Sequence, residues 1–374
     1  MAELKLQSAI ILKAPGEASV VNDLSIPSPG IGEVLIRVQA VSLNPSDWMA
    51  RDHLGRPGSG LGFDFAGTVL EVGEGAQRVR SIGDRVAGFV HGCHSANYSI
   101  GAFREYLTAD AVLLIHIPSN LEFTEAATLA MGISTAAQQL YQNLPLPIPC
   151  NTSVRTSHTI LIYSGATATG SLAIQLAKLS GFRVITTCSE KNIPWLLSLG
   201  ADAVIDYNQL DAIRHVRRHI EDCGLSIILD CVSLDATAAF CYQCFAPPLR
   251  PANENAPWTF YYASLMPVKN LPPPPKMIPE SGIIRAEWNM VFTCFGRRFT
   301  IVNQEFGLNQ TWEPSAVDRE FMAFLYRCME QIIPLGNIQP MPVKAMEGGL
   351  EGVLEGIQLV KDGGALGKKL VYAL

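Results

Sequence analysis

The sequence lacks the features that mark membrane proteins, secreted proteins and nucleic-acid-binding proteins. No apolar run reaches the ~18 residues that a helix needs to cross a bilayer. The first residues, MAELKLQSAIILKAPG, do not show the charged, apolar and small segments of a secretory signal in that order. Lys and Arg number 28 against 34 Asp and Glu, and there is no basic tract. We therefore expect a cytoplasmic protein that binds neither membranes nor nucleic acid.

The sequence also lacks a cysteine pattern that would hold a metal or a disulfide framework. Its nine cysteines are an odd number, and they are scattered through apolar segments. Cys241 and Cys244 form one Cys-x-x-Cys pair, and no second pair accompanies it. This distribution favours reduced thiols in the cytosol, with Cys241 and Cys244 as packing residues.

The chain does have the length and the apolar content for two packed domains, with 374 residues of which 48% are hydrophobic. The stretch 159–181 reads TILIYSGATATGSLAIQLAKLSG and predicts a buried strand, a turn of small residues and a helix. Such a turn lets the backbone approach a pyrophosphate at the helix N-terminus. Only Gly165 and Gly170 of the usual glycine pattern are present, so a purely structural turn is an alternative for this stretch taken alone.

The segments around this stretch indicate the fold class. Four further strands alternating with helices are expected downstream, at 183–187, 203–207, 226–230 and 259–265, and an edge strand at 288–295. This alternation is typical of a doubly wound parallel sheet. Short strands with glycine-marked turns upstream indicate a compact β-barrel, and similar material returns near the C-terminus. We expect an α/β protein with a nucleotide-binding domain, 127–299, inserted in a discontinuous β-rich domain, 1–126 and 300–374.

The order of the motifs resembles the medium-chain dehydrogenase/reductase superfamily. The matching stretches are GFDFAGTVLEVGEG, SIGDRVAGFV, GAFREY, the SGATATGSLAIQLAK unit and a terminal GKKLV. A closer resemblance, to the trans-acting enoyl reductases of fungal polyketide synthesis, is carried by NPSD at 44–47, GISTA at 132–136, the SGATAT turn, TCSEKN at 187–192 and IDY at 205–207. This resemblance implies a GroES-like β-barrel catalytic domain and a Rossmann cofactor domain. It also implies a monomer that uses NADPH to reduce α,β-unsaturated acyl thioesters on the carrier protein of a polyketide synthase or of a hybrid synthase (PKS-NRPS), in secondary metabolism.

The resemblance bears on metal use as well. Zinc-dependent relatives use a cysteine and the histidine of a GHE motif as catalytic ligands. Here Gly62-Phe63-Asp64 stands in the place of GHE, and Asp47 stands in the place of the cysteine. A structural zinc site needs four closely spaced cysteines, and the corresponding region offers only Cys93. We expect a zinc-independent oxidoreductase with no metal site.

The resemblance implies two sets of site residues. Those implied for the cofactor are Ser46, Asp47, Trp48, Met49, Ala166, Thr167, Ala168, Thr169, Ser189, Glu190, Lys191, Asn192, Tyr207, Leu265, Met266, Leu366 and Gly367. Those implied for the acyl chain are Ala136, Ala137, Gln138, Gln139, Leu140, Tyr141, Gln142, Asn143, Phe292, Thr293, Cys294, Phe295 and Gly296. Their apolar members suit a tunnel for a polyketide chain, and core packing explains them equally well from the sequence.

The choice of cofactor is expected to depend on the end of the second strand. NAD enzymes usually place an acid there, where it holds the ribose 2′-hydroxyl. Here the strand ends Thr187-Cys188-Ser189, and Ser189 with Lys191 suits a 2′-phosphate. We therefore expect NADPH, although Glu190 lies between these two residues.

The sequence does not identify the residue that donates the catalytic proton. Relatives often carry a lysine shortly after the NPSD turn, but Met49 stands there in this chain, and a thioether cannot donate a proton. Asp47 is the nearest ionisable candidate, with a turn-capping role as its alternative. Two other functions are alternatives to the reduction of carrier-bound chains: a zinc-independent quinone or alkenal reductase acting on free small molecules, and a non-catalytic NADPH-binding docking partner.

Overall fold

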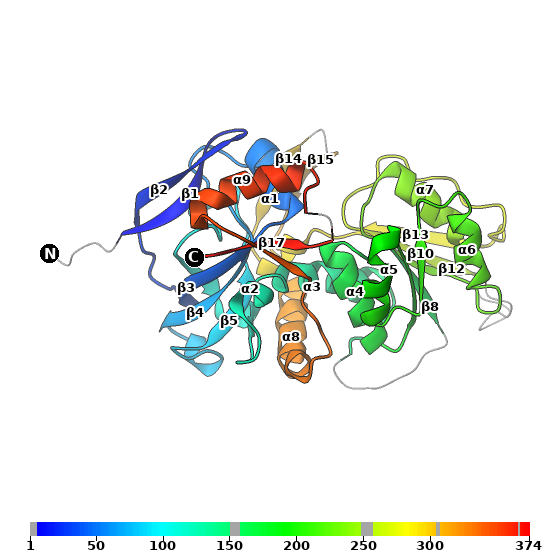
Figure 1. Cartoon of the computed structure of the whole chain (residues 1–374), viewed down its shortest axis with the longest axis horizontal. Helices are drawn as coiled ribbons and strands as arrows, with labels where there is room; N and C mark the ends of the chain where they lie inside the picture. The colour runs from blue at the N-terminus through cyan, green and yellow to red at the C-terminus, as the bar shows by residue number, and fades with distance from the viewer. Residues whose placement is uncertain (1–5, 150–157, 248–256, 304–306, 366) are drawn as a thin grey trace. The chain divides into compact units, whose positions relative to one another are not determined.

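The chain is described by a computed structural model, which covers residues 6–149, 158–247, 257–303, 307–365 and 367–374. It forms two compact units. Unit 1 comprises Met1–Met131 and Phe292–Leu374, and unit 2 comprises Gly132–Val291. Unit 2 is therefore an insertion in the chain of unit 1. Figure 1 labels many of the helices and strands of both units.

Unit 1 is built on a seven-stranded sheet in the order β16-β17-β3-β4-β5-β7, with β6 also paired to β3. Its strands are β3 (Glu33–Ser42), β4 (Asp64–Val72), β5 (Arg85–Phe89), β6 (Tyr106–Asp110), β7 (Leu114–His116), β16 (Val343–Met346) and β17 (Lys369–Ala373). The pairing is antiparallel throughout except between β16 and β17. The last strand of the chain thus lies beside one of the first.

The strands of unit 1 do not close into the expected barrel. Within the part of the chain that the structure describes, β7 and β16 end the path of the sheet and do not pair with each other. β7 is only three residues long, and Pro118 follows shortly after it without an amide hydrogen for a ladder. A separate antiparallel hairpin of β1 (Leu6–Ala14) and β2 (Glu17–Ser25) is joined to the rest by two single bridges, Ala9 to Arg104 and Ile11 to Gly60.

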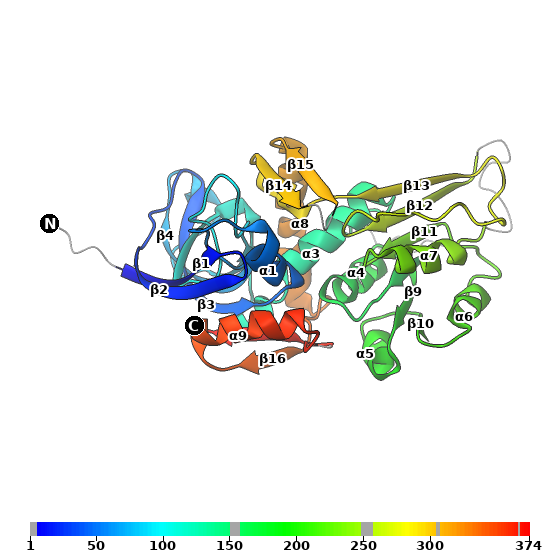
Figure 2. The same ribbon diagram turned by 90° about the horizontal axis from the view of Figure 1, so that it is seen from above.

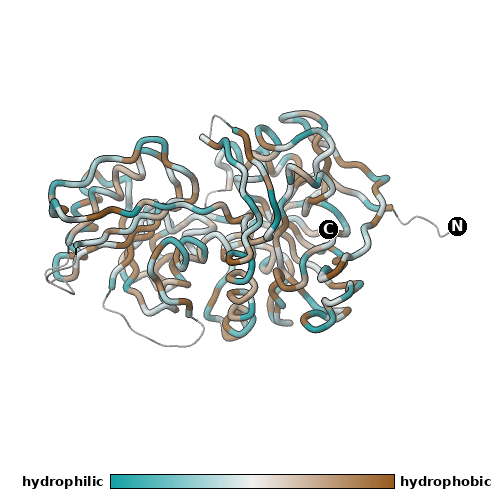
Figure 3. The backbone as a smooth tube through the Cα atoms, turned by 180° about the vertical axis from the view of Figure 1, so that it is seen from behind, coloured by the Kyte–Doolittle hydropathy of each residue, from teal (hydrophilic) through white to brown (hydrophobic). Residues whose placement is uncertain are grey.

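The helices of unit 1 are short, with two exceptions. The short ones are α1 (Pro45–Met49), the π-helix η1 (Ala50–Leu54), η2 (Ala76–Arg78), η3 (Ala111–Leu113), α2 (Phe123–Ala126) and η7 (Ile333–Leu335). The two longer ones are α8 (Ala316–Ile332) and α9 (Gly349–Lys361). The longest, α8, buries Met322, Leu325, Tyr326 and Met329 along one face, and Figure 3 shows polar and apolar residues interleaved along it. Figure 2 shows α9 running beside β16. A second hairpin, β14 (Phe299–Asn303) with β15 (Leu308–Trp312), completes the unit.

Unit 2 contains a six-stranded parallel sheet in the order β10-β9-β8-β11-β12-β13. The strands are β8 (Thr159–Tyr163), β9 (Arg183–Cys188), β10 (Ala203–Asp206), β11 (Ile227–Asp230), β12 (Thr259–Ser264) and β13 (Ile283–Trp288). The helices are α3 (Ala130–Gln138), which begins in unit 1, the π-helix η4 (Gln139–Asn143), α4 (Ala168–Leu179), η5 (Glu190–Asn192), α5 (Ile193–Ser198), α6 (Ala212–Arg218) and α7 (Asp235–Cys244). The order is that of a Rossmann sheet with its switch point between β8 and β11. The expected doubly wound parallel sheet is therefore confirmed.

Two details differ from the expectations. The strand expected at 288–295 is wrong, because β13 ends at Trp288 and Val291–Phe295 forms the 3-10 helix η6. A short apolar run carries no periodicity that separates a strand from a tight helical turn. Among the cysteines of the described residues, seven are free, namely Cys93, Cys188, Cys223, Cys231, Cys241, Cys244 and Cys294, as expected. Cys328 differs because it is disulfide-bonded, and no regular spacing in the sequence distinguishes it.

No helix among the described residues is long and apolar enough to cross a membrane.

Candidate functional site

The turn between β8 and α4 forms a helix N-terminus that can bind an anion. Thr167 caps this helix: its Oγ1 accepts the Gly170 amide at 3.0 Å and donates to the Ser164 carbonyl at 3.0 Å. Within the described chain, the amides of Ala168 and Thr169 donate to no protein acceptor. They belong to the first helical turn, where amides have no intrahelical partner. Two free N–H groups and the positive end of the helix dipole therefore suit a phosphate.

Close packing explains why two glycines of the fingerprint are present here. A Cβ on Gly165 would overlap Thr186 Oγ1, and a Cβ on Gly170 would lie 2.6 Å from the Ser164 carbonyl oxygen. Ser164 has a positive φ of 62°, a conformation that disfavours side chains. Its amide donates to Thr187 Oγ1 at 3.0 Å, which fixes the turn against the neighbouring strand. The remaining turn positions tolerate hydroxyls and methyl groups because they lie at the surface of the turn.

The residues implied for the cofactor in unit 2 follow four strands of one sheet. Ala166–Thr169 follow β8, Ser189–Asn192 follow β9, Tyr207 follows β10, and Leu265 with Met266 follows β12. Since parallel strands end at the same edge of a sheet, the structure brings these groups to that edge. Tyr207 also stacks on Tyr163, with ring centroids 5.9 Å apart.

The end of β9 is the place where the ribose is expected. Cys188 ends the strand and is buried. Ser189 precedes the short helix η5, and its Oγ accepts Asn192 Nδ2 at 3.2 Å. Glu190 and Lys191 are both exposed. The serine hydroxyl is thus fixed near the strand end, whereas the charged side chains extend into solvent.

A buried polar cluster that the sequence analysis did not identify holds the loop after β12. Ser233 Oγ accepts the amides of Leu265 at 2.8 Å and Met266 at 3.2 Å. Asp230, which ends β11, accepts the Ser233 amide at 3.0 Å and the Tyr262 hydroxyl at 2.8 Å. The available signal in the sequence is an aspartate that ends a buried apolar strand.

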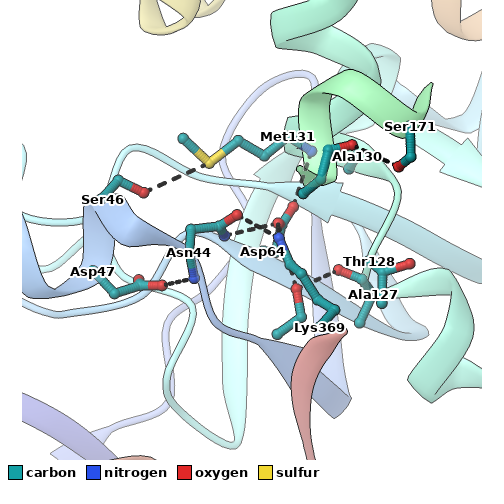
Figure 4. A network of polar contacts seen from close by, with 12 residues as sticks. Asn44, Ser46, Asp47, Asp64, Ala127, Thr128, Ala130, Met131, Ser171 and Lys369 are labelled. Atoms are coloured by element: carbon teal, nitrogen blue, oxygen red, sulfur yellow. Dashed lines mark hydrogen bonds and ion pairs between the residues drawn. The ribbon is translucent and has the colours of Figure 1, made fainter. Parts of the chain in front are cut away.

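In unit 1, a second buried polar network surrounds the NPSD turn (Figure 4). The Asp64 carboxylate accepts Asn44 Nδ2 at 2.9 Å and the Met131 amide at 2.9 Å, and it pairs with Lys369 Nζ at 3.3 Å. Lys369 Nζ also donates to Asn44 Oδ1. Asp64 is 0% exposed and Lys369 is 4% exposed, so water does not screen this ion pair. The network fixes Asn44, the residue that begins the NPSD turn, to the last strand of the unit.

Asp47 lies in the first turn of α1 and is buried. Its Oδ2 accepts the Asn44 amide at 2.6 Å, and its Oδ1 has no hydrogen-bond partner among the described residues. Burial raises the pKa of Asp47 well above its usual value, against the lowering effects of the Asn44 amide and of Lys369. The bond to Asn44 is that of a helix cap, which supports the capping alternative for this residue.

The other residues implied for the cofactor in unit 1 lie at two places. Ser46, Trp48 and Met49 are half-buried on α1, and Ser46 Oγ contacts Met131 Sδ at 3.9 Å. Gly367, with a φ of 72°, lies just before β17. Leu366 lies outside the described residues.

Many residues implied for the acyl chain are buried. Ala136–Leu140 of α3 and η4 lie in unit 2 and are fully buried. Tyr141 is half-buried, and its hydroxyl bonds to Ser180 Oγ at 3.1 Å. Phe292–Gly296 lie in unit 1, where Phe292 stacks on His91 at a centroid distance of 3.9 Å. Core packing therefore accounts for the fully buried members of the set. Those with partial exposure are Tyr141, Gln142, Asn143, Thr293, Phe295 and Gly296.

The position of the GHE imidazole carries no ligand atom. Phe63 is buried there and stacks on Phe292, with centroids 5.4 Å apart. Across the described part of the chain, no group of three or more His, Cys, Asp or Glu side chains is placed to hold a metal ion. The absence of a metal site stays a prediction of the sequence.

Comparisons with known proteins identify the fold class to which this chain belongs. The model of the alcohol dehydrogenase GroES-like domain matches residues 30–119, and the zinc-binding dehydrogenase model matches residues 168–250. Mycobacterial Rv1454c, solved in complex with NADPH, superposes with a TM-score of 0.70 at 24% identity, over 98% of this chain and 100% of that chain. The CurK enoyl reductase superposes with a TM-score of 0.68 at 17% identity, over 99% of both chains. The chain has the medium-chain dehydrogenase/reductase fold, as expected.

Two relatives define the family more narrowly. Trans-enoyl reductase resD of Aspergillus sclerotiorum is 37% identical over 378 residues, which is 97% of this chain and 99% of that protein. Trans-enoyl reductase TOXD of Cochliobolus carbonum is 39% identical over 297 residues, which is 79% of this chain and 93% of that protein. The chain belongs to the trans-enoyl reductases, a family of oxidoreductases, and the resemblance seen in its motifs is confirmed.

Proposed function

We propose that this chain is a trans-acting enoyl reductase that works with a polyketide synthase or PKS-NRPS megasynthase. It transfers a hydride from NADPH to the β-carbon of an α,β-unsaturated acyl thioester held on the carrier protein. Family membership supports the reaction class, and the free amides of Ala168 and Thr169 are the observation that carries the proposal to this chain. A Rossmann helix that presents two unpaired amides at its N-terminus suits the pyrophosphate of a dinucleotide.

The residues of unit 2 fit such a cofactor. Gly165 and Gly170 allow the backbone to approach a phosphate, while Thr167 fixes the helix cap. Ser189 and Lys191 are proposed to hold the 2′-phosphate, because a hydroxyl and a cation replace the acid that NAD enzymes place there. Ser233 holds the Leu265–Met266 backbone, which is proposed to lie against the nicotinamide. When bound, the nicotinamide supplies the hydride.

The residues of unit 1 are proposed to position the reacting groups. Ser46–Met49 are proposed to lie near the nicotinamide, and the ion pair of Asp64 and Lys369 keeps that helix in place through Asn44. Asp47 is proposed as a positioning residue, since its carboxylate caps α1. The proton for the α-carbon then comes from another group or from water, because Met49 has no proton to donate.

The polyketide tunnel is proposed to include the partly exposed members of the acyl set, with Tyr141 and Phe295 among them. The proposal includes a metal-free cytoplasmic monomer. Activity is expected to survive exhaustive chelation, and light scattering is expected to give the mass of one chain. A tightly held zinc ion, or twice the chain mass, would contradict these two points.

The decisive experiment compares one enoyl group in two forms. The protein is incubated with NADPH and an α,β-unsaturated acyl chain, either on the phosphopantetheine arm of a carrier protein or as a small free thioester. NADPH consumption and product mass are measured. A carrier-bound chain should be reduced with a higher kcat/KM, because contacts with the carrier orient the substrate.

Each of the other outcomes would indicate a different function for this chain. Equal or faster turnover of free enones and quinones would make the chain a reductase of small molecules. NADPH binding without turnover of any enoyl thioester would make it a docking partner. Heat-denatured protein and a reaction without NADPH serve as controls.

A further inference from the structure

A cavity of about 410 Å³ lies within unit 1, and it shares no residue with the network around Asp64. Residues of β1, β2, β5, β6 and of the segments 97–101 and 295–297 line it. Much of its wall is apolar, including Ile11, Leu24, Phe89, Leu107 and Phe295. Its size falls in the range of about 300–1,000 Å³ that is usual for small-molecule sites, which combine apolar walls with a few polar groups.

One of those polar groups is a buried guanidinium without a counter-charge. Arg104 lines the cavity and is 6% exposed. Its Nε has no hydrogen-bond partner, and no residue of the described chain forms an ion pair with it. Burial lowers the pKa of Arg104 to about 10, so the side chain is still charged at neutral pH. A buried charge of this kind is costly until an anion approaches it.

The other charged side chains of the cavity wall already have partners. Glu33 pairs with Arg297 at 3.0 Å, and both line the cavity. Asp110 pairs with Arg319. Neither carboxylate is therefore available to Arg104, and the wall carries one uncompensated positive charge.

His94 offers a second donor in the same wall. Its Nδ1 accepts the amides of Ala96 at 3.1 Å and Asn97 at 3.2 Å. The proton of the neutral imidazole must then be on Nε2, which is buried and has no partner among the described residues. Burial lowers the pKa of His94, which favours this neutral form. A neutral N–H donor and a cation in the same wall complement the oxygen atoms of a carboxylate.

We propose that this cavity binds an organic monoanion, a carboxylate with a short apolar body, and that Arg104 is its counter-charge. One unpaired cation matches one negative charge, and the apolar wall matches a hydrocarbon body rather than a bare inorganic ion. The cavity shares Phe295 with the residues proposed for the polyketide tunnel, but binding of the anion does not require enoyl reduction. It needs neither the α4 turn nor a carrier protein.

The test uses calorimetric titration of the full chain, without cofactor, with three probes. Octanoate carries both the charge and the apolar body, 1-octanol carries only the body, and inorganic phosphate carries only the charge. Octanoate should bind at least about tenfold more tightly than either of the others, because only octanoate satisfies both parts of the cavity. Absence of octanoate binding, or equal binding of octanoate with either control probe, would overturn the proposal.

Variants connect the binding to Arg104. Arg104→Met should weaken octanoate binding about tenfold or more and leave octanol binding unchanged, whereas Arg104→Lys should retain part of the affinity. Arg37→Met, an exposed arginine on β3, is the matched control and should change nothing. Unchanged octanoate binding in Arg104→Met, or an equal loss in Arg37→Met, would refute the assignment.

A second variant keeps the test valid if Arg104→Met does not fold. A Cβ on Gly60 would lie 2.5 Å from Arg104 Nη2 and 2.9 Å from the Ile100 carbonyl oxygen, so Gly60→Ala displaces the guanidinium together with the adjacent backbone of Ile100, while the arginine stays in the chain. Gly60→Ala should lose octanoate affinity as Arg104→Met does. NADPH binding, measured on the same samples, should not change. Octanoate affinity that survives in Gly60→Ala would contradict the role of Arg104.

Discussion

Lys369→Met should destabilise the protein far more than the loss of one lysine on the surface. The substitution keeps the apolar stem and removes the ammonium that pairs with Asp64 at 3.3 Å. Asp64 then remains a fully buried carboxylate without a cation among the described residues, and its neutral donors are the amides of Asn44 and Met131 and the Ser42 hydroxyl at 3.4 Å. Removing one partner of a buried ion pair typically costs about 3–5 kcal/mol, since the other charge is left uncompensated.

A double-mutant cycle separates the cost of the uncompensated Asp64 charge from the cost of lost packing at position 369. Asp64→Asn removes the remaining charge, so Asp64→Asn with Lys369→Met should be less destabilised than Lys369→Met alone. Lys361→Met is the matched control, because the Lys361 side chain is 41% exposed and its partner Asp52 keeps a second partner in Arg51. That control should cost no more than about 1 kcal/mol.

Urea unfolding followed by tryptophan fluorescence and circular dichroism gives the free energies of unfolding. The catalytic readout is kcat/KM, which should also fall in Lys369→Met, since Lys369 holds Asn44 at the start of α1. A cost below about 1 kcal/mol for Lys369→Met, or additive effects of the two substitutions in the cycle, would show that the Asp64 carboxylate is not left as an uncompensated buried charge in Lys369→Met. Either result would refute the reasoning.

Four further predictions concern the residues implied for the cofactor on α1, in the turn before α4 and on η5. Because burial raises the pKa of Asp47, the folded state holds this proton at a pH where the unfolded state (pKa about 3.9) has lost it. The carboxyl therefore costs more stability as the pH rises from about 4 toward the folded pKa, and Asp47→Asn should gain stability relative to the wild type as the pH is raised above about 4 in urea titrations; a difference that is constant with pH would contradict this. Thr167→Val removes the cap of α4 and should cost about 1–2 kcal/mol of stability and weaken NADPH binding, whereas Thr169→Val should weaken NADPH binding alone; a double variant with unchanged binding would exclude both roles. Lys191→Met should weaken NADPH binding about tenfold in fluorescence titrations and leave NADH binding unchanged. Equal affinity of the wild type for both cofactors would contradict the assignment of Lys191 to the 2′-phosphate. Met49→Lys should leave NADPH affinity nearly unchanged and alter turnover by a modest factor, below the roughly 10²–10⁴-fold of a general acid; loss of NADPH binding would exclude this placement of Met49.

The sequence was sufficient to predict the parallel sheet, because alternating buried strands and amphipathic helices each give a local pattern of apolar residues. The stretch 159–181 became β8 and α4 as predicted. Its glycines were also informative, since Gly165 and Gly170 stand where a Cβ would clash. The role of the Thr167 hydroxyl was less evident, because a phosphate contact and a helix cap need the same residue type at the same place.

The rest depends on contacts that leave no local pattern. Lys369 and Asp64 are 305 positions apart, and no periodicity connects them. The short edge strand β7 and the 3-10 helix η6 are too brief for an apolar period to distinguish them from neighbouring segments. Arg104 appears in the motif GAFREY as an ordinary strand residue, and only the three-dimensional structure shows that it is buried without an acid beside it.

The pairing of β17 with β3 has a consequence for synthesis on the ribosome. The two strands are separated by more than 320 residues of chain, so at ~5–20 residues per second the nascent protein carries an unpaired β3 end for roughly 15–70 s. During that time the edge of Ala40–Ser42 that later pairs with β17 has free backbone groups, and Asp64 lacks the ammonium of Lys369. An open strand edge is a template for pairing with another chain. Production of this protein should therefore depend on chaperones that hold the first strands apart until the last one arrives.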